Sequence, residues 1–566
     1  MSHSIGIHHI KMQNKFTIGV DYGTDSVRAL IVDTQTGENV GTAVHYYQRW
    51  KKGLFCDASI SQFRQHPLDY LEGLEGAIKG ALNDVSEEIR QNIAGISVDT
   101  TGSTPVAVDE NGTPLALLPE FAENPNGMFI LWKDHTGNDE AEEINNLAHD
   151  WKVDFTKYVG GIYSSEWYWA KILRTLRVDE KVREKAFSWV EHCDWVSAVL
   201  SGNTNPLTFK RSRCAAGHKA LWHEEFEGLP SEEFLTKLDP LLSGLRERLF
   251  KNTYTADLPM GTISAEWAEK LGVPNDVVIG VGTFDCHAGA VGAEIQPYDF
   301  VRVMGTSTCD MLIAPNRNDG PLEIEHLLIK GICGQVDGSI IPNMLGMEAG
   351  QSAYGDYYAW FQRIITEPVR TLLGDKAADE LGEKLIPYLS EQASKLSITE
   401  NDIVATDWIN GRRTPDANHT LKASFMGLDL GTDAVKIFKM IVEATAFGSR
   451  AIVDRFIEEG VPIKQVIAIG GVAKKSPYVM QTLCDVLNMP IKVASSDQAC
   501  ALGAAMNASV AAGIHADLFD AQKAMGSGFD ANYSPRPEAV EVYKKLYEKY
   551  QKLGKFTENN ESFSEY

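Results

Sequence analysis

The sequence predicts an α/β protein made of two related halves. Short runs rich in β-branched residues alternate with longer segments of helical spacing, which is the pattern of an α/β architecture. The 566 residues are too many for one ordinary domain. In addition, an apolar strand runs into Gly-Thr near residue 20 and again near residue 304, which predicts two similar hairpins with a cleft between them.

Apolar runs that we expect to form strands mostly end in clusters of Gly, Thr, Ser or Asp. These runs are residues 16–21, 27–32, 93–98, 277–281, 300–304, 310–314 and 466–469. The first two are predicted to pair as a hairpin, and so are 300–304 and 310–314. In open α/β sheets ligands bind at the carboxyl ends of strands, so these clusters are the first candidates for a binding site.

Helical spacing is clearest at residues 69–82, 434–458 and 538–553. The last of these has one apolar face and one charged face, as a docking helix requires. This helix can dock either on its own chain or on a second copy of the chain, so the sequence does not decide between a monomer and a homodimer. We expect four segments: a leader at 1–14 that is disordered or left from cloning, an N-terminal domain at 15–298, a C-terminal domain at 299–515, and a helical tail at 516–566.

The charge and cysteine content exclude several classes of protein. The 53 Lys and Arg against 77 Asp and Glu give a net charge of −24, which argues against nucleic-acid and anionic-membrane partners but not against a small phosphorylated ligand. No apolar run has the length of a membrane span, and the first residues lack a signal-peptide core. The 8 cysteines form no CxxC pair, so a cytoplasmic protein without a zinc knuckle or disulfide framework is expected.

Residues 21–28, DYGTDSVR, are the first candidate ligand-binding motif. Gly23 at a hairpin tip lets backbone N–H groups approach a phosphate, and Thr24 adds a hydroxyl. Asp21 is a candidate for holding Mg²⁺ through its waters, because this ion keeps much of its hydration shell. Arg28 is expected near the phosphates. For this motif alone, an ordinary hairpin turn with polar tip residues is the competing interpretation.

Two further glycine motifs extend this prediction. Residues 305–308, GTST, favour a plain turn when taken alone, but together with the first motif they predict a two-jawed phosphate clamp. Residues 469–476, IGGVAKKS, place glycines between a buried strand and a helix, where a base or ribose can lie against the backbone. Neither GxGxxG nor the Walker A pattern occurs, which disfavours a dinucleotide-binding dehydrogenase and a P-loop kinase.

Asp285 is the candidate general base. It follows a strand and precedes a helix of small residues, a place from which a carboxylate can take a proton from a substrate hydroxyl. A helix N-cap explains an Asp at this position equally well. The neighbouring Cys286 and His287 are expected to be structural.

Three segments have the mixture of side chains that binds a polyol. Trp132 stands beside polar residues, Lys219 stands near another Trp, and Glu348 lies among small residues where a carboxylate needs a partner. An aromatic face can stack on the C–H side of a sugar while polar groups bond its hydroxyls. Taken singly, the two Trp segments are also explained by core tryptophans with polar neighbours.

In this order, the motifs resemble the FGGY family of carbohydrate kinases over residues 16–505. The ordered set is specific: GVDYGTDSVR, GISVDTTGST, GTFDCHAGAVGA, MGTSTCD, NGRRTP with FMGLDLGTD, and AIGGVAKKSPYVMQ with ALGAA. The family's second signature is only approximate around 436–438. The segments EFAENPNGMFILWKDHT, CAAGHKALWH and GMEAGQSAYGDYYAWF are most similar to members that phosphorylate L-ribulose. Xylulose kinases carry a Gln-Met-His-type turn where this chain has residues 101–103, TGS, which argues against xylulose as the main substrate.

This resemblance implies two actin-like ATPase (ribonuclease H-like) domains around a deep cleft, with ATP and Mg²⁺ on one side and the sugar on the other. The implied reaction is ATP-dependent phosphorylation of L-ribulose at O5, in L-arabinose catabolism. Asp285 would be the base and Asp21 would position Mg²⁺. The expected ATP-binding residues are Gly23, Thr24, Arg28, Gly305, Thr306, Gly350, Gly471, Ala473 and Ser476. The expected sugar-binding residues are Gly102, Trp132, Lys219, Asp285 and Glu348.

Three alternatives stay open from the sequence. A sibling kinase on the same scaffold would act on D-ribulose, D-xylulose, ribitol or glycerol. An actin-like ATPase that serves as a chaperone or filament would share the phosphate hairpins but need no polyol pocket. A silent sugar-binding regulator would not need the Asp21 and Asp285 motifs.

Overall fold

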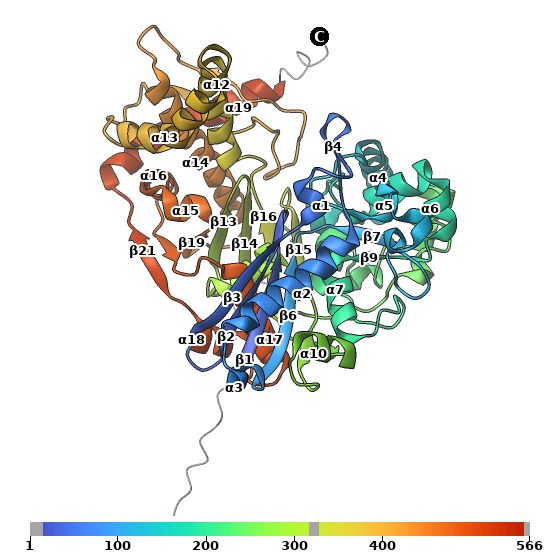
Figure 1. Cartoon of the computed structure of the whole chain (residues 1–566). Coiled ribbons are helices and arrows are strands. Elements are labelled where there is room, and N and C mark those ends of the chain that lie inside the picture. The colour runs from blue at the N-terminus through green and yellow to red at the C-terminus, as the bar shows by residue number, and fades with distance from the viewer. Residues whose placement is uncertain (1–14, 316–327, 560–566) are drawn as a thin grey trace, which may run out of the picture.

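The computed structural model describes residues 15–315 and 328–559, which form two lobes that meet along a shared seam (Figure 1). The predicted leader at 1–14 lies outside the described residues. None of the helices in the described ranges is long and apolar enough to cross a membrane.

The first lobe is built on a sheet with the strand order β10-β11-β6-β1-β2-β3, and β12 also pairs with β6. Its strands are β1 (Phe16–Tyr22), β2 (Ser26–Asp33), β3 (Asn39–Tyr46), β6 (Ile93–Thr100), β10 (Pro259–Thr262), β11 (Val278–Gly280) and β12 (Thr283–Phe284). The predicted first hairpin is confirmed, because β1 and β2 pair antiparallel. Strand β6 runs parallel to β1, so both strands end at the same edge of the sheet.

The second lobe repeats this arrangement in a sheet with the order β15-β16-β14-β13-β19-β20-β21. Its strands are β13 (Asp299–Met304), β14 (Thr308–Pro315), β15 (Gly334–Asp337), β16 (Met344–Ala349), β19 (Gln465–Ile469), β20 (Ile491–Ala494) and β21 (Phe529–Tyr533). Strands β13 and β14 form the second predicted hairpin, and β19 runs parallel to β13. The two halves inferred from the sequence are therefore two copies of one strand pattern.

Two helices rich in small residues, α11 (Asp285–Gly292) and α17 (Ala499–Ala511), form the seam between the lobes. Helix α17 belongs to the second half of the sequence but packs on the first sheet, where Thr17 donates a hydrogen bond to the carbonyl of Ala505 at 2.9 Å. A Cβ on Gly19 would lie 1.7 Å from the carbonyl oxygen of Ala501, so only glycine permits this approach. The expected boundary near residue 298 therefore does not separate all contacts of the two halves.

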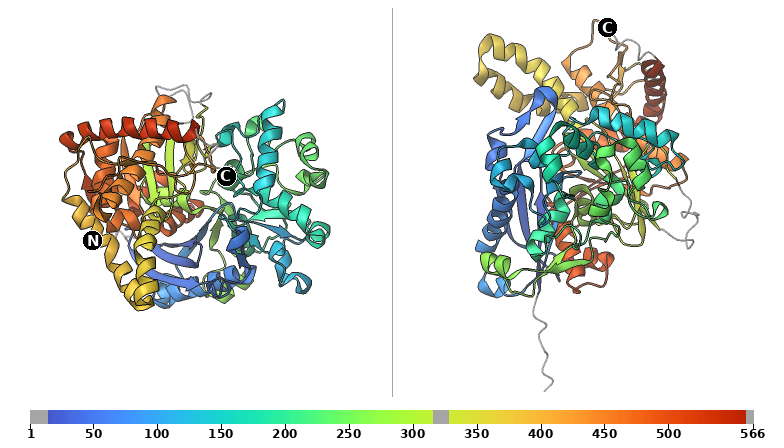
Figure 2. Two further views of the ribbon diagram at one scale, coloured as in Figure 1. Left: turned by 90° about the horizontal axis from the view of Figure 1, so that it is seen from above. Right: turned by 90° about the vertical axis from the view of Figure 1, so that its right-hand side faces the viewer.

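A helical insertion in the first lobe contributes part of the wall of the cavity between the lobes that is described below. It contains α4 (Asn138–Asp150), α5 (Tyr168–Val178), α6 (Glu180–Lys185), α7 (His192–Ser201), α8 (Arg213–Lys219) and α9 (Glu232–Leu238). Two small sheets accompany it, formed by β7 (Pro105–Val108) with β9 (Ser188–Glu191), and by β4 (Cys56–Asp57), β5 (Gln62–Gln65) and β8 (Phe129–Ile130). These helices gather on the side of the molecule opposite the second lobe (Figures 1 and 2).

The outer helices cover both sheets and confirm two helix predictions. Helix α2 (Pro67–Asn83) packs on the first sheet, and α14 (Ala434–Glu458) has the predicted bounds. The second lobe adds α12 (Gly355–Leu373), α13 (Asp375–Ser394), α15 (Gly471–Lys475) and α16 (Pro477–Leu487). Helix α12 begins directly behind the β13–β14 turn, where the N–H of Tyr354 donates to the carbonyl of Thr306 at 2.8 Å.

The predicted helical tail at 516–566 contains a strand as well as helices. Helices α18 (Leu518–Met525) and α19 (Pro537–Asn559) are present, but β21 lies between them as an edge strand paired with β20. Helix α19 lies along the second lobe (Figure 2) and buries Tyr543, Leu546 and Tyr550 in its core. The amphipathic helix thus docks on its own chain. The strands expected from the sequence were continuous apolar runs, whereas this strand, FDANY, alternates apolar and polar residues, which is the pattern of a half-buried edge strand.

Candidate active site

A cavity of about 270 Å³ lies between the lobes, where the strands of both sheets end. It collects residues from segments that are far apart in the sequence. Its lining includes Gly23, Thr24, Gly102, Trp132, Lys219, Asp285, Gly305, Thr306 and Glu348, all of which are predicted ATP- or sugar-binding residues. We call this space the inner cavity.

Asp285 lies on the first turn of α11 and is not the N-cap, which is Phe284. One of its carboxylate oxygens accepts a hydrogen bond from the N–H of Cys286 at 2.7 Å. Burial and the nearby negative charge of Asp21 raise the pKa of Asp285 to about 7. A carboxylate with a pKa close to neutral is well matched to accept a proton from a hydroxyl group.

Two further carboxylates, Asp21 and Asp99, lie side by side at the ends of β1 and β6. Burial raises the pKa of Asp21, and Arg28 opposes this shift from 3.3 Å. Asp99 is fully buried, and burial together with the charges of Asp21 and Asp285 raises its pKa well above the usual range. Its oxygens receive no hydrogen bond from an N–H or hydroxyl of the described residues.

This group of buried oxygens fits a hard divalent cation. The charges of Asp21 and Asp285 both raise the pKa of Asp99, Arg28 is the cation that opposes them, and Mg²⁺ prefers oxygen ligands, including waters held by carboxylates. Arg28 therefore turns to Asp21 and does not line the cavity. Asp99 was not among the predicted site residues, although its place at the end of strand 93–98 was the available signal.

The opposite wall of the inner cavity carries an ion pair that joins the lobes. Lys219, from α8, donates to Glu348, from β16, at 2.7 Å. Burial raises the pKa of Glu348, but Lys219 and the rings of His218 and His287 outweigh it and hold this pKa at about 2. The same carboxylate raises the pKa of Lys219 against its burial. Both groups are therefore charged at neutral pH, and each can bond a sugar hydroxyl.

Trp132 links the sugar side of the cavity to the first phosphate hairpin. Its indole Nε1 donates to the hydroxyl oxygen of Thr24 at 3.1 Å. The neighbouring Asp134 is buried and pairs with Arg64, so it has a structural role. Gly102 lies against the ring of Phe284, because a Cβ on this glycine would be 1.9 Å from a ring carbon.

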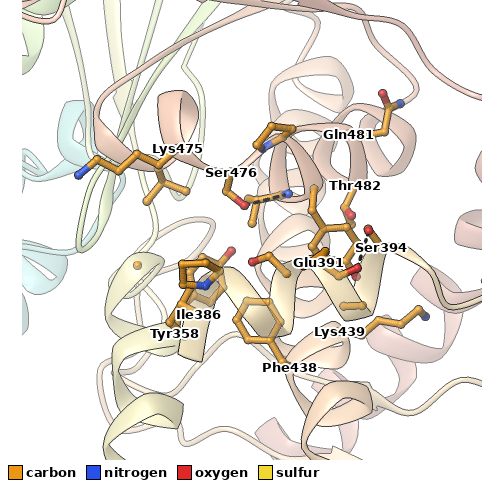
Figure 3. A pocket seen from close by; sticks show the side chains of 18 of the residues that line it. Tyr358, Ile386, Glu391, Ser394, Phe438, Lys439, Lys475, Ser476, Gln481 and Thr482 are labelled. Atoms are coloured by element: carbon orange, nitrogen blue, oxygen red, sulfur yellow. Dashed lines mark hydrogen bonds between the residues drawn. The ribbon is translucent and has the colours of Figure 1, made fainter. Parts of the chain in front are cut away.

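A second, larger cavity of about 960 Å³ opens beside the first and lies wholly in the second lobe (Figure 3). Tyr358 and Phe438 face it from one side, and Ser476 and Thr482 face it from the other (Figure 3). Gly305 and Thr306 line both cavities. The second phosphate hairpin is therefore the place where the two spaces meet. We call this larger space the outer cavity.

The structure brings only some of the predicted nucleoside residues to the outer cavity. Gly471 and Ser476 line it, and the Ser476 side chain also caps α16. Gly350 does not line it, because it packs on β14, where a Cβ would be 2.2 Å from the carbonyl oxygen of Thr308. Ala473 is buried in the core. Gly355, at the start of α12, lines the cavity instead. Nothing in the sequence indicated that Gly355 and not Gly350, five residues earlier in the same segment, would take this place.

Three lining residues of the inner cavity were also missed. Glu166 from the first lobe faces Arg413 from the second at 3.8 Å, and His419 lies beside them. Burial lowers the pKa of His419. Arg413 stands in a motif used for the family resemblance, NGRRTP, but no local pattern in the sequence indicated that it meets Glu166.

Comparison with known proteins defines the class. Residues 16–292 match the N-terminal domain of the FGGY family of carbohydrate kinases, and residues 301–512 match its C-terminal domain. The chain therefore belongs to the FGGY family of carbohydrate kinases, as its motifs predicted.

Two curated relatives show which members of the family this chain is similar to. The chain is 49% identical over 560 residues to a ribulokinase from Vibrio parahaemolyticus, with 98% of both chains covered. It is 38% identical over 555 residues to a ribulokinase from Halalkalibacterium halodurans, with 95% of this chain and 94% of that one covered.

Solved structures confirm the predicted two-domain fold. A xyloylose kinase from Brucella ovis matches with a TM-score of 0.76 at 19% identity, covering 95% of this chain and 98% of that one. A xylulose kinase from Rhodospirillum rubrum matches with a TM-score of 0.76 at 17% identity, covering 97% and 100%. At these identities the likeness shows the fold alone.

Proposed function

We propose that this protein transfers the γ-phosphoryl group of ATP to O5 of L-ribulose and forms L-ribulose 5-phosphate, a step in L-arabinose catabolism. The observation that carries this proposal is the shared hairpin. Gly305 and Thr306 line both the outer cavity, which has room for a nucleotide, and the inner cavity, which holds Asp285. A phosphoryl group held there is within reach of a sugar hydroxyl. The identity to named ribulokinases supports L-ribulose as that sugar.

In this proposal, the chain's own residues supply positioning and proton transfer. Lys219 and Glu348 bind sugar hydroxyls, and Trp132 and Gly102 shape the wall on which the carbon skeleton rests. Asp285 takes the proton from O5 as this oxygen attacks the γ-phosphorus in line with the leaving ADP. Backbone N–H groups of the two hairpin turns and the hydroxyls of Thr24 and Thr306 hold the phosphate oxygens.

Asp21 and Asp99 are the residues that would hold Mg²⁺. When bound, this ion neutralises charge on the phosphate oxygens and orients them. Because Asp21 affects the pKa of Asp285 and Asp285 affects the pKa of Asp99, a cation held by Asp21 and Asp99 would lie near the reacting groups. Closure of the lobes over the sugar would keep water from the γ-phosphate.

We also propose that the enzyme acts in the cytoplasm, where ATP is abundant and thiols stay reduced. Its 8 cysteines are all free, as expected for that compartment. A homodimer remains a prediction from the sequence.

Product analysis tests the position of transfer. The enzyme is incubated with Mg-ATP and ¹³C-labelled L-ribulose, and ¹³C–³¹P coupling identifies the phosphorylated carbon. Coupling to C5 and C4 is expected. Coupling to C1 and C2 would show that the sugar binds in the reverse direction, and a product only from D-xylulose, ribitol or D-ribulose would assign the chain to a sibling kinase.

A further inference from the structure

Lys171 is a buried amino group whose hydrogen bonds all go to the backbone, and burial lowers its pKa to about 7. It lies on α5 with 1% of its surface exposed, and no carboxylate of the described residues pairs with it within 4.0 Å. Its Nζ donates to the carbonyl oxygens of Ser103 at 2.7 Å, Leu131 at 2.9 Å and Ile130 at 3.4 Å. A buried cation without a close ion partner is costly, and an apolar side chain would fill this space at lower cost. Packing alone therefore does not explain why a lysine occupies this position.

Glu191 holds the same loop from its other side. It ends β9, with 3% of its surface exposed, and accepts hydrogen bonds from the N–H of Thr104 at 2.7 Å and from the hydroxyl of Ser103. Ser103 is thus bonded through its carbonyl to Lys171 and through its hydroxyl to Glu191. Neither Lys171 nor Glu191 lines the inner or the outer cavity.

The two loops joined by Lys171 both carry walls of the inner cavity. Ser103 follows Gly102, and Leu131 precedes Trp132, and both Gly102 and Trp132 line that cavity. Gly102 also packs against Phe284, the residue before Asp285, so close that any Cβ would collide with its ring. A shift of the Ser103 loop would therefore change the distance across the cavity and the contact beside the proposed base.

We propose that Lys171 and Glu191 form a clamp that fixes the Gly102 loop relative to the Trp132 loop and thereby sets discrimination among ketopentoses. Both are positioning residues, since they act through the backbone of the two loops and do not touch the sugar. The clamp rests on the proposed function, because it concerns the same sugar cavity. The ketopentoses that the inner cavity must distinguish differ in the configuration of their hydroxyl groups. A rigid wall therefore rejects the wrong sugar, because a polar group of the cavity would be left without a hydrogen bond.

The first variant is Lys171→Met, which keeps much of the side-chain length and removes all three donors. We expect KM for L-ribulose to rise about tenfold and the kcat/KM preference for L-ribulose over D-xylulose to fall about tenfold, the effect of losing one well-placed polar contact. KM for ATP should stay within about twofold of wild type, because the outer cavity lies in the other lobe.

Two weaker variants keep the test decisive if Lys171→Met does not fold. Ser103→Ala removes the hydroxyl that bonds Glu191, and Glu191→Gln keeps an acceptor oxygen but loses the charge. Both should shift sugar KM and sugar preference in the same direction by a smaller factor. The control is Arg246→Met, since Arg246 also donates to backbone carbonyls, at Pro230, Leu229 and Glu227, in a loop that lines neither cavity. It should lower the melting temperature without changing either KM.

The outcomes separate the clamp from the proposed function. Unchanged sugar KM and preference in folded variants, or an equal rise in KM for sugar and ATP, would overturn the clamp. A wild-type enzyme that phosphorylates no sugar would instead overturn the proposed function, and with it the premise of the clamp.

Discussion

The two lobes use the same strand pattern for different chemistry. In the first lobe, the residue two places before the hairpin glycine is Asp21, and its parallel neighbour on β6 is Asp99. In the second lobe, the corresponding positions on β13 and β19 are Val303 and Ile469, which are also direct neighbours. Each hairpin turn is closed by its glycine N–H, which donates from Gly23 to the carbonyl of Ser26 at 2.9 Å and from Gly305 to the carbonyl of Ser307 at 3.0 Å, so the second turn is one residue shorter.

This difference shows how one scaffold can serve two purposes. Each lobe has a turn that begins with a glycine, whereas at the strand positions just before the turn the first lobe carries carboxylates and the second lobe carries apolar side chains. The first lobe therefore concentrates negative charge for a cation and a base, and the second lobe keeps an apolar strand edge next to the outer cavity. Changes at the first-lobe strand ends should affect turnover most, and changes in the outer cavity of the second lobe should affect nucleotide binding.

The largest effect is expected from Asp285→Asn. Removing the general base should lower kcat by a factor of about 10²–10⁴ while leaving the sugar dissociation constant close to wild type. Single-turnover kinetics and calorimetric sugar binding measure the two quantities. The variant also removes a buried charge, so its melting temperature at pH 8 should be no lower than wild type. Near-normal kcat would remove Asp285 from the role of base.

Glu348→Ala tests the contact that crosses between the lobes. It removes a sugar ligand and leaves Lys219 buried without its partner, so KM for L-ribulose should rise by about 10–100-fold. KM for ATP should change much less. Equal losses for both substrates would indicate that Glu348 is structural and that the ion pair only holds the lobes together.

The pH dependence of kcat/KM tests the role of the first-lobe carboxylate Asp285. Because the pKa of Asp285 is raised to about 7, kcat/KM should fall about tenfold per pH unit below that value as the base becomes protonated. The same raised pKa makes the free energy of unfolding change with pH in the opposite direction to activity. The folded protein binds this proton more tightly than the unfolded chain, so stability should decline as pH rises from about 4 to about 7. Asp285→Asn should lose this part of the melting-temperature profile.

The smallest effect is expected in the second lobe from Ser476→Ala. Ser476 lines the outer cavity and caps α16, and loss of a serine cap costs about 1 kcal/mol of stability. We expect KM for ATP to rise only a few-fold, about as much as one neutral hydrogen bond contributes, with kcat and sugar KM unchanged. A loss of kcat as large as that of Asp285→Asn would contradict the division of labour between the lobes.

Features that depend on local sequence were predictable. The two hairpins and α14 follow from apolar runs, turn glycines and helical spacing, and part of the inner-cavity lining, including Gly23, Asp285 and Gly305, follows from motifs at strand ends. The family model matches confirm the resemblance that connected those motifs. The roles of individual site residues stay predictions.

Features that depend on contacts between distant segments were not predictable. Helix α17 packs on the first sheet because small residues on both sides allow a close approach, and a single segment does not reveal its partner. The pairing of Arg413 with Glu166 and the position of Gly355 in place of Gly350 arise in the same way. Asp99 is different, since its place at the end of strand 93–98, within the motif GISVDTTGST, was visible in the sequence.

The central claim is sugar-dependent phosphoryl transfer between two cavities that meet at the β13–β14 hairpin. The most direct measurement is coupled ADP release with Mg-ATP against L-ribulose, D-ribulose, D-xylulose, ribitol, glycerol and no sugar. We predict strong stimulation that is greatest with L-ribulose and absent in Asp285→Asn. ADP release at the same rate with and without every sugar would contradict the claim and leave an actin-like ATPase that binds no sugar.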